Sequence, residues 1–263
     1  MGGISFDRAA SFYDATRGLP GEVGSSLAAM LARELAGRGR CLEIGVGTGR
    51  MALPLHHLGI PMTGTDISAA MLNRLVTNSA KNPDEHHRGP PFPLLRGDAT
   101  DLPLRAVSFG AVMASHVLHL IPGWQSAVDE AVRVLRPAGV LLVDFGGLTP
   151  APWHAVSLSV LEAHGIGYVR PGVSHPEPVL DHLGSRADMR RLPAVDITVR
   201  RSPGQDIDDW ERQIHAWTWP YDASQMRIAC QAVRARAAQE GWQIDAQVEL
   251  TDTIQWWAFD LAP

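Results

Sequence analysis

Short apolar segments alternate with segments of helical periodicity between residues 40 and 145, and this alternation constrains the fold more than any other feature of the sequence. In the helical segments, apolar residues recur three or four positions apart. The expected strands are residues 40–44, 60–65, 92–96, 107–114 and 140–145. Strands that alternate with helices pair in parallel through right-handed crossovers, so the sequence predicts an α/β fold with a mostly parallel sheet and helices on both faces.

Outside this core, the expected strands and helices alternate less regularly. Residues 1–39 are expected to form lead-in helices, residues 40–150 the core, and residues 151–263 the remainder of the sheet with a helical lid insertion at about 150–245. Within the last segment, helices are expected at 153–164, 177–191, 206–217 and 223–239, and strands at 195–201 and 251–261.

The first strand runs into a glycine-rich turn, Glu43-Ile44-Gly45-Val46-Gly47-Thr48-Gly49. Glycines let the chain turn tightly and let the backbone approach a ligand, and the turn opens a helix whose N-terminal amides favour negative charge. The G-x-G-x-G spacing differs from the G-x-G-x-x-G spacing of dinucleotide sites. Glu43 stands two positions before the first glycine, where it could meet an ammonium group. A tight turn that holds no ligand is the alternative interpretation.

Two further carboxylates stand at expected strand ends. Asp66 follows the second strand, where an acidic residue can accept hydrogen bonds from the hydroxyls of a ribose. Asp98 follows the third strand, where its carboxylate could accept from an adenine amine while the amide of Ala99 donates to a ring nitrogen. Either aspartate alone would be read as a turn former or helix cap. Together with the glycine turn they predict a nucleoside-binding edge of the sheet.

Five ordered segments carry a family resemblance: LEIGVGTGR (42–50), GTDIS (64–68), GDATDLPL (97–104), SHVLHLIPGW (115–124) and EAVRVLRPAGVLLV (130–143). In this order and spacing they resemble the class I S-adenosylmethionine-dependent methyltransferases, of the group that includes the ubiquinone/menaquinone C-methyltransferases. The resemblance implies a Rossmann-like sheet of seven strands. It also implies S-adenosyl-L-methionine as cofactor, S-adenosyl-L-homocysteine as product, and an enzyme that methylates a small organic acceptor. A cytoplasmic location is expected separately, because no apolar run could span a bilayer and the N-terminus lacks the pattern of a signal peptide.

The resemblance also implies roles for individual residues. Glu43, Gly45 and Gly47 would line the methionine part of the cofactor. Asp66 would bind the ribose, Ile67 would pack on the adenine, and Asp98 and Ala99 would read the adenine edge. Ser115 would offer its backbone beside the methionine moiety, and Tyr13 and Arg17 would close over the cofactor. The expected cofactor-binding residues are Tyr13, Arg17, Glu43, Gly45, Val46, Gly47, Asp66, Ile67, Met71, Asp98, Ala99 and Ser115.

Two histidines that follow the fourth strand are the candidates for catalysis. A methyl sulfonium needs a nucleophile in line and at close range, and a general base helps where the acceptor is a hydroxyl or an acidic carbon. His116 and His119 lie on the side where the methyl group would point, and His119 is the slightly preferred base. The alternative is that one histidine orients the loop and the other packs beneath Trp124.

Composition narrows the remaining possibilities. The net charge of −5 over 263 residues argues against a general nucleic-acid surface, and no apolar run is long enough to span a bilayer. The two cysteines suggest neither a disulfide framework nor a zinc site, and no metal site is expected. An NAD-type oxidoreductase and a non-catalytic protein that binds S-adenosylmethionine or S-adenosylhomocysteine remain as alternatives. The oligomeric state is left open.

Overall fold

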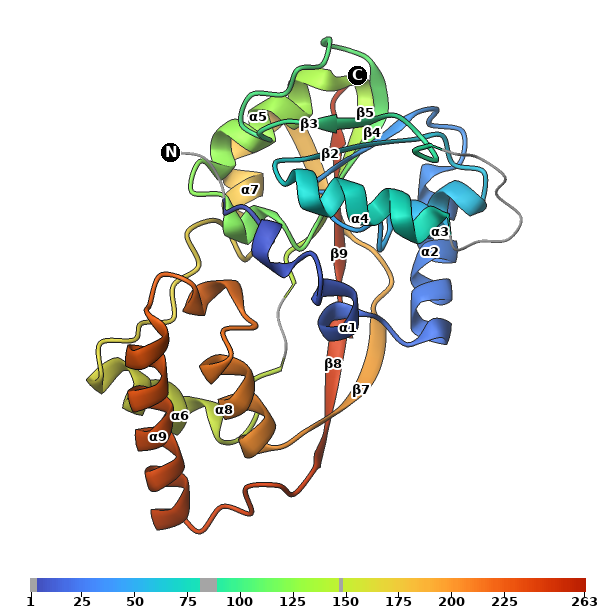
Figure 1. Cartoon of the computed structure of the whole chain (residues 1–263). Coiled ribbons are helices and arrows are strands. Elements are labelled where there is room, and N and C mark those ends of the chain that lie inside the picture. Colours follow the sequence, from blue (N-terminus) through green and yellow to red (C-terminus); the bar gives the residue numbers. More distant parts are fainter. Residues whose placement is uncertain (1–3, 81–88, 147–148) are drawn as a thin grey trace. The chain divides into compact units, whose positions relative to one another are not determined.

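The computed structural model describes residues 4–80, 89–146 and 149–263. The chain divides into two units, and Figure 1 shows the elements of each. The first unit contains residues 1–146, 171–195 and 254–263, and the second contains residues 147–170 and 196–253. The segment 171–195 therefore belongs to the first unit, although the sequence placed it inside the insertion.

A seven-stranded sheet forms the first unit, in the order β3-β2-β1-β4-β5-β9-β6. Strands β1 to β5 are parallel, and β9 is antiparallel to both of its neighbours. The prediction of a Rossmann-like, mostly parallel sheet is confirmed. The strands are β1 (Cys41–Ile44), β2 (Met62–Asp66), β3 (Leu94–Arg96), β4 (Phe109–Ser115), β5 (Leu135–Asp144), β6 (Ala187–Arg191) and β9 (Trp256–Leu261).

Helices cover both faces of this sheet, because alternate side chains of each strand point to opposite faces. Leu42 and Ile44 of β1 belong to a core shared with α5 and α7, whereas Cys41 belongs to a second core shared with α2 and α3. The helical elements of the unit are η1 (Asp7–Ala9), α1 (Tyr13–Arg17), α2 (Gly21–Leu35), α3 (Ala52–His57), α4 (Ala69–Ser79), η2 (Leu118–Leu120), α5 (Trp124–Val134), α7 (Pro176–Leu183) and η3 (Gly184–Arg186).

The second unit is mainly helical and has its own apolar core, which includes Leu161, Ile207, Trp210 and Met226. Its elements are α6 (His154–Ala163), β7 (Val195–Arg201), α8 (Pro203–Glu211), η4 (Ala216–Thr218), α9 (Ala223–Gln239) and β8 (Val248–Ile254), and β7 pairs with β8. The buried carboxylate of Asp206 holds several of these elements together. It accepts hydrogen bonds from Trp153 Nε1 at 2.8 Å and from Arg201 Nη2 at 2.9 Å.

The predicted helix at 177–191 is wrong in its second half. Helix α7 ends at Leu183, because Gly184 has a positive φ of 56°, and residues 187–191 form strand β6 beside β9. Ala187 and Met189 face the apolar core, at the two-residue period of a strand. The expected terminal strand at 251–261 is in fact two strands, β8 and β9, which are separated at Gln255.

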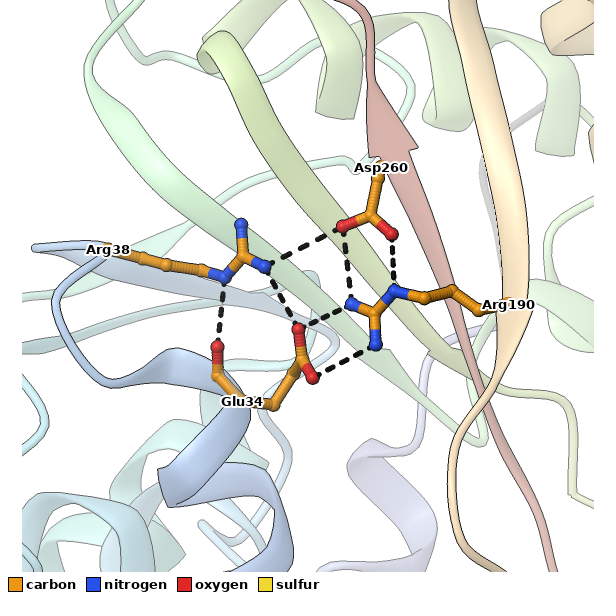
Figure 2. Close-up of polar contacts among 4 residues, drawn as sticks. All are labelled: Glu34, Arg38, Arg190 and Asp260. Carbon is orange, nitrogen blue, oxygen red and sulfur yellow. Dashed lines mark hydrogen bonds and ion pairs between the residues drawn. The ribbon is translucent and has the colours of Figure 1, made fainter.

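Ion pairs join the end of α2 to β6 and β9, at the sheet edge opposite the carboxyl ends of the parallel strands. Figure 2 shows Arg38 and Arg190 each contacting both Glu34 and Asp260. The hydrogen bonds that Arg190 donates to Asp260 and Glu34 raise its pKa above the ordinary value. Because the arginine carries its charge throughout the working pH range, this network is a permanent tether and not a switch.

The N-terminus of α4 is capped by two side chains. Ser68 Oγ accepts a hydrogen bond from the amide of Met71 at 3.1 Å and donates one to Asp7 Oδ1 at 2.6 Å. Asp7 also accepts from the amide of Ala70 at 3.2 Å. Ser68 is therefore the N-cap of α4, and the N-terminal segment is fixed to the same helix end.

Replacement of Ser68 by alanine is expected to lower the free energy of unfolding by about 1 kcal/mol, because the amide of Met71 loses its capping acceptor. Urea denaturation measures this change. The matched control is Ser26→Ala on the exposed face of α2, which should change stability by less than about 0.5 kcal/mol. Equal effects of the two substitutions would contradict the capping role.

Among the residues that the structure describes, no helix is long and apolar enough to cross a membrane.

Candidate functional site

The glycine turn connects β1 to α3 at the carboxyl edge of the sheet. Gly45 and Gly47 have φ values of +65° and +55°, which favour glycine. A Cβ on Gly45 would lie 2.5 Å from Val117 Cγ2, so a side chain at this position is also sterically excluded. A Cβ on Gly47 would lie 3.3 Å from Met71 Cε, which places Met71 against the turn. The turn therefore presents bare backbone at the point where the strand order reverses, between β1 and β4.

Asp66 connects the end of β2 to this turn. Its Oδ2 accepts from the amide of Gly47 at 2.9 Å, and its Oδ1 accepts from the amide of Ser68 at 2.8 Å. Burial raises the pKa of Asp66, and the amides that it accepts from oppose this effect only in part. A carboxylate has about four acceptor positions, so after its bonds to the amides of Gly47, Ser68 and Ile67 it can still accept from a hydroxyl.

Glu43 is a buried carboxyl group in the middle of the sheet, with 2% of its surface exposed. It accepts a hydrogen bond from the backbone of Ala52, and its Oε2 has no hydrogen-bond partner among the residues that the structure describes. Burial raises the pKa of Glu43 to about 8, although Arg50 lowers it. A buried oxygen without a partner costs stability, and a ligand cation would supply the missing donor.

The N-terminal segment is attached beside the turn. Asp14 accepts hydrogen bonds from Arg74 Nε at 3.0 Å and from Asn78 Nδ2 at 2.9 Å, and both donors belong to α4. The carbonyl of Arg17 accepts from Arg50 Nη1 at 3.3 Å. These contacts bring α1, which carries Tyr13 and Arg17, to the glycine turn and α4.

The remaining expected adenine contacts follow β2 and β3. The carbonyl of Ile67 accepts from Arg96 Nε at 3.1 Å, and the amide of Gly97 donates to the carbonyl of Asp66 at 3.1 Å, so the two strand ends are adjacent. Asp98 Oδ1 accepts from the amide and the hydroxyl of Thr100, at 2.9 and 2.8 Å. Asp98 thus forms a turn with Thr100. Ala99 packs against the core.

Ser115 and His116 follow β4, beside the end of β5. Ser115 is the register partner of Asp144, and its Oγ accepts from Arg50 Nη2 at 3.3 Å. His116 contacts Asp144 twice: its amide donates to the Asp144 carbonyl at 2.9 Å, and its Nε2 lies 2.9 Å from Asp144 Oδ2. Burial acts to raise the pKa of Asp144, but attraction to His116 and hydrogen bonds from His116 and Gly146 outweigh it, so the pKa is lowered.

His119 lies elsewhere in the same loop. It belongs to η2, it is half-buried, and its carbonyl accepts from the amide of Gly172 at 3.0 Å. The structure therefore pairs a carboxylate with His116, although the sequence slightly favoured His119 as the base. Sequence reasoning missed Asp144. The available signal was its position at the end of the fifth strand, directly before Phe145 and Gly146.

Comparison with known proteins identifies the core of this chain. Residues 42–143 match the family model described as a methyltransferase domain. This chain carries a methyltransferase domain. The matched range includes the glycine turn, Asp66, Asp98 and both histidines, and it ends one residue before Asp144.

Curated relatives and solved structures resemble the domain and the residues around it. Phosphatidylethanolamine N-methyltransferase of Cereibacter sphaeroides is 33% identical over 105 residues, which are 40% of this chain and 49% of that protein. Demethylmenaquinone methyltransferase of Streptomyces avermitilis is 30% identical over 161 residues, which are 57% of this chain and 63% of that protein. The chain thus spans between about half and two thirds of these relatives.

A structural neighbour shares the fold over nearly the whole chain. Phosphoethanolamine N-methyltransferase 2 of Haemonchus contortus, solved with phosphomonomethylethanolamine and S-adenosylhomocysteine, has a TM-score of 0.55 and 15% identity. The match covers 98% of this chain and 58% of that one. This chain and that methyltransferase therefore share their fold.

Proposed function

We propose that this protein transfers a methyl group from S-adenosyl-L-methionine to a small organic acceptor and releases S-adenosyl-L-homocysteine. The single observation that carries the proposal is the buried carboxyl of Glu43 at the glycine turn, with an oxygen that lacks a partner among the described residues. This oxygen suits the α-ammonium group of the cofactor. A dinucleotide has no ammonium group there, so the same observation disfavours the NAD-type alternative.

Several contacts support the assignment of individual residues to the cofactor. The backbone at Gly45, Val46 and Gly47 suits the methionine part of the cofactor. Ser115, at the end of β4, suits the same part. The carboxylate of Asp66 suits the ribose hydroxyls. Four residues suit the adenine, with Ile67 and Met71 packing on it and Asp98 and Ala99 reading its edge. Tyr13 and Arg17 suit a cover over the cofactor, because the N-terminal segment is fixed to α4 by Asp7 and Asp14.

The relatives are named for substrates as different as a lipid amine and a quinone precursor, so their names do not select one acceptor. A net charge of −5 favours a small molecule over a nucleic acid as partner, and we propose a cytoplasmic location. His116 and His119 are the candidates for proton transfer. When bound, the cofactor supplies an electrophilic methyl sulfonium, so the protein has to orient the acceptor, exclude water and accept a proton where the acceptor carries one.

The proposal is tested with S-adenosylmethionine labelled in its methyl group and a panel of small hydroxyl, amine and carboxylate compounds. We expect labelled product and S-adenosylhomocysteine in equal amounts. Cofactor binding without transfer to any acceptor would indicate a binding protein without catalysis. Binding of NAD in place of S-adenosylmethionine would contradict the proposal.

A further inference from the structure

The contact between His116 and Asp144 fixes which imidazole nitrogen carries the proton. Asp144 is 5% exposed, and the attraction to His116 and its hydrogen bonds keep its pKa low, so it is an ionised acceptor. Its Oδ1 accepts from the amide of Gly146 at 2.9 Å, and its Oδ2 lies 2.9 Å from Nε2 of the ring. A carboxylate at that distance favours the Nε2–H form of a neutral histidine, which leaves a lone pair on Nδ1.

Gly146 packs on the face of the His116 ring and leaves the ring edge open. A Cβ on Gly146 would lie 2.7, 2.9 and 3.1 Å from Nδ1, Cε1 and Cγ of the ring. These nearly equal distances describe a position above the ring face, since a position in the ring plane beside Nδ1 would be much farther from its two neighbours. The Nδ1 lone pair lies in the ring plane, so Gly146 does not obstruct it. The side chain of His116 is 32% exposed, which leaves room for an acceptor.

The backbone at His116 is held in an uncommon conformation. Its φ of +52° lies in the left-handed region, which costs energy in a residue with a side chain. Two contacts with Asp144 hold His116 in this conformation. The His116 amide donates a hydrogen bond to the Asp144 carbonyl, and the His116 ring contacts the Asp144 carboxylate. Arg50 also acts on this pair, because its charge lowers the pKa of Asp144 and its Nη2 donates a hydrogen bond to Ser115 Oγ.

We propose that His116 is the general base of the methyl transfer, that Asp144 is its positioning residue, and that the acceptor is a hydroxyl compound. This inference rests on the proposed methyltransferase function. The hydroxyl proton passes to His116 Nδ1, the oxygen lone pair forms the new O–CH₃ bond, and the electron pair of the breaking S–CH₃ bond remains on sulfur. A carboxylate would reach the site already deprotonated and would gain nothing from this pair, whereas alcohols and phenols carry a proton that the pair can accept.

The first test reads the ring directly in the unliganded protein. In protein labelled with ¹⁵N in its histidine rings, we expect neutral His116 to be protonated at Nε2 and unprotonated at Nδ1. Asp144→Asn should mix the two tautomers. Asp129→Asn is the matched control, because it breaks another His–Asp contact of 2.9 Å, to His182, outside the site. An Nδ1–H tautomer in the parent protein would overturn the proposal.

The second test measures methyl transfer to catechol and hydroquinone, with benzylamine and benzoate as comparison acceptors. We expect turnover with the hydroxyl compounds only. His116→Asn, which tolerates a positive φ, should lower kcat by about 100-fold or more with KM and cofactor affinity nearly unchanged. It should also remove the limb of the rate profile that rises with pH. Asp144→Asn should lower kcat by about tenfold or more, and Asp129→Asn should leave it unchanged.

Two results separate this inference from the proposed function. If the parent protein does not bind S-adenosylhomocysteine by calorimetry, the methyltransferase proposal itself fails. If it binds but methylates no hydroxyl acceptor, or if His116→Asn keeps the parental kcat and pH profile, only the base assignment is overturned.

Discussion

Replacing Glu43 by glutamine is expected to raise the free energy of unfolding of the unliganded protein by about 2 kcal/mol at about pH 7.5. The folded protein keeps the Glu43 proton up to about pH 8, whereas the unfolded chain loses it near 4.5. Between these values the folded state binds more protons, so stability falls by about 1.4 kcal/mol per pH unit as the pH rises. Glutamine removes this loss, and the buried amide that it introduces offsets part of the gain.

Below about pH 4 both states of the parent are protonated, so this gain should vanish and only the cost of the buried amide should remain, which makes the variant less stable than the parent there. Urea denaturation at several pH values measures the difference between the two proteins, and Glu162→Gln on the surface of α6 is the control, with no pH-dependent difference expected. Glu43→Gln should also weaken S-adenosylhomocysteine binding, because a neutral amide cannot pair with an ammonium group. A variant that is less stable at high pH and binds as tightly as the parent would contradict the role of Glu43.

The same pKa predicts proton release when the cofactor binds. If the ammonium group ionises Glu43, binding at about pH 7 should release close to one proton, since the free site is mostly protonated there. Calorimetry in buffers of different ionisation enthalpy counts the protons. Glu43→Gln should release almost no protons when the cofactor binds.

Replacing Asp66 by alanine is expected to weaken S-adenosylhomocysteine binding by about 1–3 kcal/mol, which is about five-fold to 150-fold in the dissociation constant. The loss has two sources, the ribose hydroxyls and the amide of Gly47, whose acceptor is Asp66. Asp66→Asn keeps one side-chain oxygen that can accept from an amide. Its dissociation constant for S-adenosylhomocysteine should therefore lie between those of the parent and the alanine variant. Calorimetry well below the unfolding temperature separates affinity from stability.

Asp7→Ala is the matched control for Asp66. It removes another carboxylate that holds the N-terminus of α4, through Ser68 and Ala70, and it has no assigned contact with the cofactor. We expect a loss of stability and a smaller loss of affinity than in Asp66→Ala, because Asp7 fixes the segment that carries Tyr13 and Arg17 but contacts no ribose hydroxyl. An equal loss of affinity in both variants would mean that the order of α4, and not a ribose contact, explains the effect of Asp66.

Much of the fold could be predicted because short strands that are buried on both faces alternate with helices of 3.6-residue period. Short apolar strands such as β1 and β2 stand out between glycine turns, and their order along the chain fixes the parallel sheet. Strand β6 was missed, because its arginine-rich sequence has little apolar signal and its pairing partner, β9, lies about 70 residues away in the chain. Non-local pairing overrides local propensity at such positions.

The candidate site could be predicted where it depends on strand ends, and not where it depends on side-chain direction. Glu43, Asp66 and Asp98 follow from the rule that ligands bind at the carboxyl ends of parallel strands. The pairing of His116 with Asp144 depends on the positive φ of His116, which turns the ring toward β5. The sequence contains no sign of that angle, and therefore could not choose between His116 and His119.

Calorimetric titration of the parent protein with S-adenosylhomocysteine and, separately, with NAD tests the central claim most directly. We expect one-to-one binding of S-adenosylhomocysteine in the micromolar range, with the release of close to one proton that depends on Glu43, and no heat from NAD. Binding of NAD, or of neither ligand, would contradict it.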